Sequence, residues 1–463
     1  MFSFLLRKQR LMGVLLVLVL VACNQPLERE KGGVDITTLG AIPNDGKDDT
    51  VAIERALNVS GEITMPKGIY QVEGLVRVGK KSIIHGNGAT FRSSLDTSNG
   101  GRTSKNIMTL SGDLIEIDDL TLDGAYSNGD AKAGGLVASL LHIYDSNKVV
   151  LRGVKSINHA SNWWEKFDYA QLNDDHQKDM FSVIYIAFSH DITIEAMEQL
   201  GNIKTEGLLI YESDHVRIHG FLSEHSPEIW SSLSVLASED IEMDEVTASD
   251  GLPNQSGSSI NFVANHHFLI KNTTTTTKQG FDISNEIKVK DATLRIGRDT
   301  SFGRFEHCYF KGQRALHAYP TIGRMEDIVF YDTTFIPTKA GYETWGARIE
   351  KAGKIRFEGC TFGSKAWKTY GIIMGESQQV TVKDCTFINP SIGVYLYGKH
   401  FKEVWIEENL FEGEAYTPVG FNWKGGGVVD RLIFRRNRLR GEVKGENPLK
   451  IMGNFKIKKN IKE

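Results

Sequence analysis

The sequence predicts an all-β chain, a single-stranded parallel β-helix (a solenoid) with a short N-terminal capping helix. The first observation is a recurring phrase: a small polar residue, two spacers and an apolar–any–apolar triplet. The second is its period, because copies centred on Val216 and Ile241, or on Ile355 and Val380, lie about 25 residues apart, a spacing typical of repeat architectures. The third is the two-residue alternation inside each copy, which indicates strand. Units this small bury their apolar face only by stacking on neighbours, which gives one continuous core.

The copies share this pattern although their residues differ. A length of 463 residues would suggest two or three domains, but repeats override that expectation because a solenoid grows in one dimension. We therefore place one domain at 34–463, with an N-terminal cap at 34–75 and an inserted loop at 157–180. The copies read SNKVVL from Ser146, SHDITI from Ser189, SDHVRI from Ser213, SEDIEM from Ser238, NHHFLI from Asn265, MEDIVF from Met325, AGKIRF from Ala352, SQQVTV from Ser377 and FKEVWI from Phe401.

Residues 1–22 are predicted to be a lipoprotein signal peptide and 23–33 a tether. Three cations precede an apolar run at 11–21 that is too short to span a membrane stably. The run ends Leu-Val-Ala-Cys, which resembles a bacterial lipobox. That resemblance implies cleavage before Cys23, lipidation of its thiol and, with Asn24 following, export to the outer membrane. An ordinary signal peptide is the alternative.

The charge of the chain argues against nucleic acid as a partner. Removing the three signal-peptide cations from the whole-chain charge of −4 leaves about −7. No basic tract precedes the short lysine-rich C-terminal tail, so a phosphate backbone finds no cationic surface. Membrane contact is expected only through the N-terminal lipid, and the chain is expected to be a monomer.

Three cysteines remain after processing, and they occupy one position of the repeat. Cys308, Cys360 and Cys385 appear in HCYF, GCTF and DCTF. Stacked strands lie about 5 Å apart, so a disulfide between Cys360 and Cys385 is geometrically open. We favour buried thiols that act as small apolar residues. No metal-binding CxxC spacing occurs.

The N-terminal cap is predicted as a strand, a turn, a helix at 51–57 and a second strand. Asp49 or Thr50 can N-cap the helix, and the apolar helix face can seal the open end of the solenoid. The segment DITTLGAIPNDGKDDTVAIERAL, followed by PKGIY, resembles the opening of the pectate-lyase-like superfamily. This resemblance implies a right-handed parallel β-helix and a polysaccharide-related activity. The aspartates in it are expected to brace turns.

Strand alternation indicates which side chains face outward in the strand that precedes each phrase. Aligning LLHIYD, VIYIAF, LLIYE, LSVLA and INFVA places Leu141, Ile184, Leu208, Leu233 and Ile260 inward, together with Ile143, Ile186, Ile210, Val235 and Phe262. The outward column then contains a polar stripe of His142, Tyr185, Asn261 and Asp282. His142, Tyr185 and Asp282 are candidate catalytic residues, and Asn261 is a candidate for substrate binding.

The inserted loop adds further candidates. It combines aromatic rings, which stack on sugars, with carboxylates and an imidazole, which can move protons. Long insertions in solenoids often line the binding face, although tryptophans can equally pin the loop to the coil. The candidates are Asp174, Asp175 and His176 for catalysis, and Trp163, Trp164 and Lys178 for substrate binding.

Other loops at the same end of this strand supply the remaining predicted substrate-binding residues. Each of these residues alone is typical of a protein surface. Their recurrence at the same place in consecutive coils is what indicates a binding site. They are Lys204, Glu228, Trp230, Arg314, His317 and Arg348.

These residues leave the reaction type open. Glycoside hydrolysis needs two carboxyl groups, and β-elimination needs a base together with a cation or Ca²⁺ that neutralises a uronate carboxylate. Motifs of the polygalacturonase branch (NTD, paired aspartates, GHG) and the DPH motif of alginate epimerases are missing. We expect an enzyme that depolymerises an extracellular anionic polysaccharide by hydrolysis or elimination, with a non-catalytic surface glycan-binding protein or an epimerase as alternatives. No cofactor is required by the pattern, and Ca²⁺ stays open.

Overall fold

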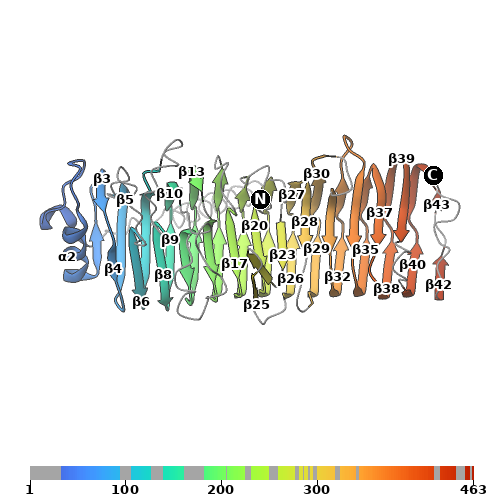
Figure 1. Cartoon of the computed structure of the whole chain (residues 1–463), viewed down its shortest axis with the longest axis horizontal. Helices are drawn as coiled ribbons and strands as arrows, with labels where there is room; N and C mark the ends of the chain where they lie inside the picture. The colour runs from blue at the N-terminus through green and yellow to red at the C-terminus, as the bar shows by residue number, and fades with distance from the viewer. Residues whose placement is uncertain are drawn as a thin grey trace, which may run out of the picture.

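The protein is an elongated rod of stacked coils that follow one another in chain order (Figure 1). This is a computed structural model that describes residues 33–93, 106–126, 139–160, 182–204, 206–224, 231–249, 259–276, 281–284, 286–289, 292–295, 300–318, 324–339, 344–421, 428–444, 454–458 and 461–462. Neighbouring coils pair in parallel through strands one coil apart in sequence. The predicted parallel β-helix is therefore confirmed.

Each coil contributes one strand to each of three parallel sheets. Sheet 1 holds the strand that precedes the phrase, sheet 2 the phrase itself, and sheet 3 the strand that follows. Sheet 1 consists of β4 (Leu75–Arg77), β6 (Met108–Gly112), β8 (Leu141–Ser146), β11 (Ser182–Ala187), β14 (Glu206–Tyr211), β17 (Leu233–Leu236), β20 (Ile260–Val263), β23 (Phe281–Ser284), β28 (Arg314–Ala318), β31 (Trp345–Ile349), β34 (Thr369–Met374), β37 (Pro390–Leu396) and the end of β39 (Leu410–Phe421).

Sheets 2 and 3 share the long strands near the N-terminus. Sheet 2 consists of β2 (Glu62–Thr64), the starts of β5 (Ser82–Ser93) and β7 (Ile115–Asp123), β9 (Val149–Arg152), β12 (Ile192–Glu195), β15 (Asp214–His219), β18 (Glu239–Asp244), β21 (His266–Lys271), β26 (Ser301–Glu306), β29 (Glu326–Tyr331), β32 (Ala352–Glu358), β35 (Ser377–Lys383), β38 (His400–Glu407), β40 (Val428–Arg435) and β42 (Asn454–Lys458). Sheet 3 consists of β3 (Ile69–Val72), the ends of β5 and β7, β10 (Lys155–Ala160), β13 (Glu198–Lys204), β16 (Leu222–Glu224), β19 (Thr247–Ala248), β22 (Thr274–Thr276), β27 (Tyr309–Gly312), β30 (Thr334–Pro337), β33 (Thr361–Gly363), β36 (Thr386–Ile388), the start of β39, β41 (Arg438–Val443) and β43 (Ile461–Lys462).

The small polar residue of the phrase forms a ladder at the corner between sheets 1 and 2. Each serine hydroxyl donates to the carbonyl two residues earlier and accepts the backbone N–H of the previous coil's serine, as in Ser189 N–H to Ser213 Oγ and Ser213 N–H to Ser238 Oγ, both 3.2 Å. Asn265 Oδ1 continues the ladder by accepting from Ser238 N–H at 2.9 Å. The phrase therefore starts with a small polar side chain because a buried corner needs its backbone groups paired.

The interior is one continuous apolar core, and every residue predicted to face inward lies in it, from Leu141 to Phe262. Toward the C-terminus the core is a stack of phenylalanine rings. Phe335, Phe362, Phe387 and Phe411 lie 4.9, 5.1 and 4.5 Å apart in succession. The three cysteines are buried free thiols, so the disulfide that the sequence left open does not form.

The N-terminal end is closed by β1 (Val34–Asp35), the 3-10 helix Ile36–Leu39 and helix α2 (Thr50–Ser60), visible at the end of the rod in Figure 1. The expected N-cap is corrected. Asp49 precedes α2, but its carboxylate instead accepts from the N–H groups of Ile42 and Gln71. Asp48 accepts from Thr50 N–H at 3.1 Å and so performs the capping bond. The aspartates of this segment therefore brace turns, as expected.

Two features of the chain differ from the predicted layout. Residues 155–160 form β10, which pairs with β7 and β13, so the coil continues past position 157, where the insertion was expected to start. An antiparallel hairpin, β24 (Glu286–Val289) with β25 (Ala292–Arg295), follows β23 and was not predicted. Its alternating residues resemble those of a coil strand, so sequence pattern alone does not separate the two.

Candidate functional site

The outward column of sheet 1 has the register that the sequence predicted. His142 lies opposite Tyr185, and Asn261 lies opposite Asp282, each in the next coil. The structure extends this column in both directions. It reads Thr109, His142, Tyr185, Leu209, Ser234, Asn261, Asp282, His317, Arg348, Ile373 and Tyr395.

The N-terminal part of this column is outward-facing but buried, which the expected solvent-facing stripe did not anticipate. Tyr185 is 1% exposed and His142 is 8% exposed. Tyr185 belongs to a second apolar cluster, which is separate from the interior core and lies on the outward side of the sheet. Its members are Tyr185, Ala187, Leu209, Tyr211, Leu236, Ala237, Val263 and Ala264.

His142 is held in one neutral tautomer. Asn106 Oδ1 accepts from Ser139 N–H at 2.9 Å, which makes its other side-chain atom the amide nitrogen. That Nδ2 donates to Thr109 Oγ1 at 2.9 Å and lies 3.3 Å from His142 Nδ1, which therefore accepts. Burial lowers the pKa of His142 to about 4. The ring also stacks on Tyr185 with centroids 4.9 Å apart.

Glu206, the first residue of β14, is the carboxyl group of sheet 1 with the most altered acidity among the described residues. It lies opposite Ser182 of β11 and is partly buried. Loss of solvation raises the pKa of its carboxyl to about 7. A carboxyl group protonated near neutral pH is suited to donating a proton to a leaving group.

A second group of polar side chains gathers farther along the same face, at β28 and β31. Arg314 and Arg348 each place their guanidinium carbon 5.1 Å from the ring centroid of Trp345. The indole N–H donates to Leu316 O at 3.1 Å, and Trp345 is 2% exposed. Trp345 therefore supports the two cations from below and is too buried to stack on a ligand itself.

Arg348 and Tyr397 converge on one carboxylate oxygen. Arg348 donates from Nε and Nη2 to Glu350 Oε1 at 2.8 and 2.6 Å, and the Tyr397 hydroxyl donates to the same oxygen at 2.8 Å. Burial alone would lower the pKa of Arg348, but the hydrogen bond and charge of Glu350 raise it. Burial, followed by Glu350, raises the pKa of Tyr397. We call Trp345, Arg348, Glu350 and Tyr397 the Arg348 cluster.

Aromatic rings and a neutral imidazole surround this cluster. The Tyr395 ring lies 5.5 Å from Tyr370 and 6.4 Å from Tyr397, and all three are partly exposed. His317 lies 5.8 Å from Trp345. Burial, then the charges of Arg348 and Arg314, lower its pKa to about 3, so it stays neutral at physiological pH. Partly exposed tyrosines beside a guanidinium offer stacking and charge recognition together.

The predicted residues do not form one site, and Asn261 lies on β20, between the two groups on sheet 1. Arg314, His317 and Arg348, which were expected in loops, lie on strands β28 and β31. Arg314, His317 and Arg348 lie together at the Arg348 cluster, and His142 and Tyr185 lie together farther toward the N-terminus. Lys204 ends β13, which belongs to sheet 3 and not to sheet 1. Asp282 is placed by the register of β23 alone, and its side chain lies outside the described residues, as do Cys23, Trp163, Trp164, Asp174, Asp175, His176, Lys178, Glu228 and Trp230.

Glu350, Tyr370, Tyr395 and Tyr397 were missed as site residues. Positions 350, 375 and 397 stack because their backbone N–H groups donate to Ala318, Ile349 and Met374 of the preceding coils. Continuing the outward parity past Arg348 would have indicated Glu350, but the phrase loses its leading serine in this region. Tyr397 follows a strand whose register is shifted, which hides its alignment.

The described residues contain no group of three or more histidine, cysteine, aspartate or glutamate side chains that could hold a metal ion. Within these same ranges, no helix has the length and apolarity needed to cross a membrane.

No family model matches the chain. A curated relative is the pre-neck appendage protein of Bacillus phage B103, 29% identical over 139 residues, which are 28% of this chain and 16% of that protein. Three solved structures are similar. They are the pre-mature gene product 12 of bacteriophage phi29 (14% identity, 98% of this chain and 58% of that chain, TM-score 0.47), the A-module of the Azotobacter vinelandii mannuronan C-5 epimerase AlgE6 (11%, 93% and 99%, 0.38), and the Streptococcus pneumoniae surface adhesin PfbA (12%, 93% and 94%, 0.37).

Proposed function

We propose that this chain is an exported, lipid-anchored protein that binds an acidic polysaccharide along the outward face of sheet 1 and cleaves it by β-elimination. The anchor would be the lipidated Cys23 in the outer membrane, as the lipobox resemblance implies. The observation that carries the proposal is the Arg348 cluster, where a half-buried guanidinium lies against aromatic rings on the outside of a long parallel sheet.

The spacing of the sheet supports an extended ligand. Successive strands of sheet 1 are about 4.8 Å apart, so outward side chains form a row with a regular short repeat. Arg348, Ile373 and Tyr395 occupy successive places in that row. A linear polymer laid along the rod would meet a cation and then aromatic rings, which matches sugars that carry a negative charge.

Elimination fits the groups of this cluster better than hydrolysis does. A base removes the proton from the carbon beside the sugar carboxylate, a carbon–carbon double bond forms, and the glycosidic oxygen leaves with a proton. Arg348 would neutralise the carboxylate, and the Tyr395 phenolate, formed when its hydroxyl loses a proton to solvent, would take the sugar proton and return it to the glycosidic oxygen. The Tyr397 hydroxyl already donates its proton to Glu350 and would only orient the cluster. Hydrolysis needs two carboxyl groups across one bond, whereas the cluster offers Glu350, which is already hydrogen-bonded to Arg348 and Tyr397.

Hydrolysis is a second candidate because of Glu206. Its raised pKa, about 7, is the property expected of a general acid in glycoside hydrolysis. Glu206 lies on β14, five strands from β31 along sheet 1, so the two reactions would take place at different points of the same face.

The test is to incubate residues 24–463, which omit the lipidated Cys23, with neutral, uronic-acid and sulfated polysaccharides, with and without EDTA. New reducing ends together with ultraviolet absorbance of an unsaturated product support elimination. Reducing ends without that absorbance overturn elimination and lead to Glu206. Binding without either signal would make the chain a glycan-binding protein. If the chain neither binds nor cleaves any acidic polymer, the proposal is refuted.

A further inference from the structure

Glu350 is the fixed point of the Arg348 cluster. Three hydrogen bonds end on its Oε1, from Arg348 Nε, Arg348 Nη2 and the Tyr397 hydroxyl. The side chain is 12% exposed. Tyr397 is 47 residues away in sequence and reaches Glu350 because positions 350, 375 and 397 stack in consecutive coils. A buried carboxylate with three donors has one stable position.

Gly375 closes the other side of Glu350. Gly375 N–H donates to Ile349 O at 2.7 Å, which places its backbone directly beside the carboxylate. A Cβ at position 375 would lie 2.8 Å from Glu350 Oε2 and 3.2 Å from Glu350 Cα. A side chain at position 375 would therefore require the Glu350 carboxylate to shift from the place where its three donors hold it.

Arg348 is consequently fixed along one edge and between two rings. Its guanidinium carbon lies 5.1 Å from the Trp345 centroid and 5.6 Å from the Tyr397 centroid. Nε and Nη2 form the edge that faces Glu350, and no residue in the described ranges forms a hydrogen bond with Nη1. The side chain is 27% exposed, so the Nη1 edge is the one that a ligand can reach.

We propose that Glu350 is a positioning residue that makes this site specific for an unesterified sugar carboxylate. It occupies one edge of the Arg348 fork and leaves the Nη1 edge to the ligand. The inference rests on the proposed function, since it concerns the same site. An arginine held in its binding geometry before the ligand arrives loses less rotamer freedom on binding than a mobile one.

Charge repulsion predicts the opposite effect of Glu350 on binding, so the direction of the change in affinity distinguishes the two explanations. Glu350 is negatively charged and would repel an acidic ligand, so removing it could tighten binding. Positioning predicts the reverse, because an Arg348 without Glu350 loses two of its hydrogen bonds and the contact that orients it. The two effects act on the same affinity with opposite signs.

The experiment compares wild-type protein with Glu350→Ala, Glu350→Gln and Gly375→Ala. Affinities are measured for polygalacturonate and alginate and for the methyl ester of each. We expect wild type to prefer the free acids, and Glu350→Ala and Gly375→Ala to lose roughly tenfold of that preference. Glu350→Gln keeps an oxygen acceptor and should retain part of it. Glu407→Ala, which removes the acidic partner of Arg435 on sheet 2, is the matched control and should change nothing.

Equal or tighter binding of the free acids by Glu350→Ala would overturn the proposal. A crystal structure of this variant supplies an independent readout. The Arg348 guanidinium should leave the Trp345 ring, and an unmoved guanidinium would overturn positioning whatever the ligand. If wild type binds none of the polyuronates, the proposed function fails while the crystal structure still decides the role of Glu350.

Discussion

The outward faces of sheets 1 and 2 use the same charged and aromatic residues in different ways. On sheet 2, opposite charges face each other directly across neighbouring strands, as in Glu403 opposite Arg431 and Glu407 opposite Arg435. On sheet 1, Arg348 pairs with Glu350 of its own coil, and Tyr397 joins from two coils away. Register pairing needs only nearest neighbours, whereas convergence on one atom needs several coils to be placed together.

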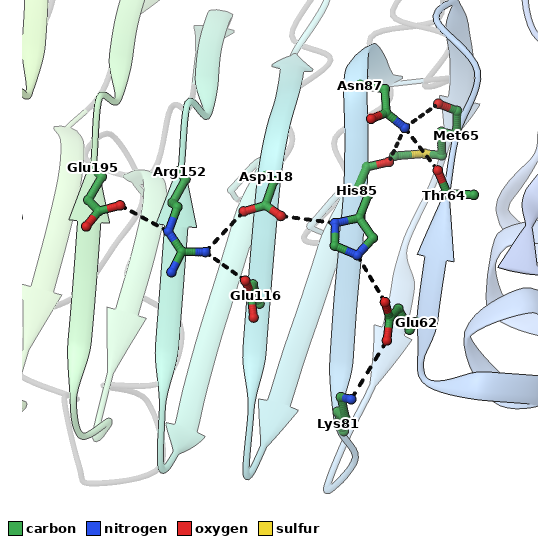
Figure 2. A network of polar contacts seen from close by, with 10 residues as sticks. All are labelled: Glu62, Thr64, Met65, Lys81, His85, Asn87, Glu116, Asp118, Arg152 and Glu195. Atoms are coloured by element: carbon green, nitrogen blue, oxygen red, sulfur yellow. Dashed lines mark hydrogen bonds and ion pairs between the residues drawn. The ribbon is translucent and has the colours of Figure 1, made fainter. Parts of the chain in front are cut away.

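Sheet 2 shows its pairing most fully near the N-terminus. Figure 2 shows His85 between Glu62 and Asp118, at 3.2 and 3.0 Å, and Arg152 reaching Glu116 and Glu195 at 2.7 and 3.0 Å. The network links five consecutive strands, β2, β5, β7, β9 and β12. The charged groups of this network pair with one another, which indicates that this face stabilises the coils.

Trp405, on sheet 2, also lies against two arginines and can be compared with Trp345. The guanidinium carbons of Arg431 and Arg435 lie 4.9 and 5.7 Å from its ring centroid. Each of these arginines has its own glutamate in the neighbouring strand, and among the described residues no tyrosine hydroxyl takes part. A tryptophan with two arginines is therefore not a site by itself. The Trp345 cluster differs from the Trp405 cluster because the Tyr397 hydroxyl joins Arg348 at Glu350.

The largest expected effect separates the two tryptophan clusters. Arg348→Ala should weaken binding or cleavage of an acidic polymer about 100-fold, because a half-buried charge that contacts the ligand is lost. Arg348→Lys keeps the charge but not the fork and should cost about tenfold. The measurement is kcat/KM or Kd for the acidic polymer.

Arg435→Ala and Arg435→Lys on sheet 2 are the controls, because Arg435 and Glu407 have the same side-chain exposures as Arg348 and Glu350, 27% and 12%. They should leave these constants within about twofold, since the pair lies on the other sheet and is independent of the proposed site. Equal losses from the sheet 1 and sheet 2 variants would break the comparison.

The second effect concerns pH and the buried part of sheet 1. The folded pKa of His142 is about 4, below the 6.5 of the unfolded chain, so the unfolded state binds more protons between these values. Stability should be complete above pH 6.5 and fall as the pH drops toward 4, by at most about 3 kcal/mol from this residue. His317 acts in the same direction.

Denaturant midpoints measured across this pH range check the prediction. His142→Phe keeps a ring against Tyr185 and removes the titration, so its midpoint should depend less steeply on pH. An unchanged slope would show that His142 is accessible to protons in the folded state.

A smaller effect is expected from the network in Figure 2. His85→Ala leaves the carboxylates of Glu62 and Asp118 without their shared partner and should lower the free energy of unfolding by about 1–3 kcal/mol. Polymer binding should not change, because sheet 2 is not the binding face. Thermal unfolding and a binding assay on the same variant test both statements, and a binding loss without a stability loss would exchange the roles of the two sheets.

The smallest effect belongs to exposed pairs such as Arg217 and Glu242, whose charged atoms are 3.5 Å apart and whose side chains are 48% and 41% exposed. Arg217→Ala should cost less than about 1 kcal/mol of stability, and high salt should remove the difference. Comparing its thermal midpoint at low and high salt tests this, and a larger salt-resistant loss would mean that the pair is more buried than its exposure indicates.

Much of the fold could be predicted because each coil repeats a local pattern. The serine that opens the phrase, the inward Ile184 and Ile186 and the outward Tyr185 all follow from period-two alternation within one strand. The end of β10 and the β24–β25 hairpin could not be predicted, since strand residues look alike whether they continue a coil or leave it.

The candidate site was predictable in part. Arg314, His317 and Arg348 were expected at one end of the same sheet. The structure places His317 opposite Arg348 and Arg314 opposite Trp345, so that all three gather at Trp345. Whether an outward residue is exposed was not predictable. His142 and Arg348 share one column, yet His142 is buried among aromatic rings and Arg348 is partly open to solvent.

The sequence by itself determined the coil period and the parity of the strands, because these depend on residues close together in the chain. Only the tertiary structure decided that Arg348 and Tyr397, 49 residues apart, share a hydrogen bond with each other and a carboxylate oxygen with Glu350. The reason is the stacking itself. Contacts between coils depend on the exact length of every intervening turn and insertion, and a repeat pattern does not record those lengths.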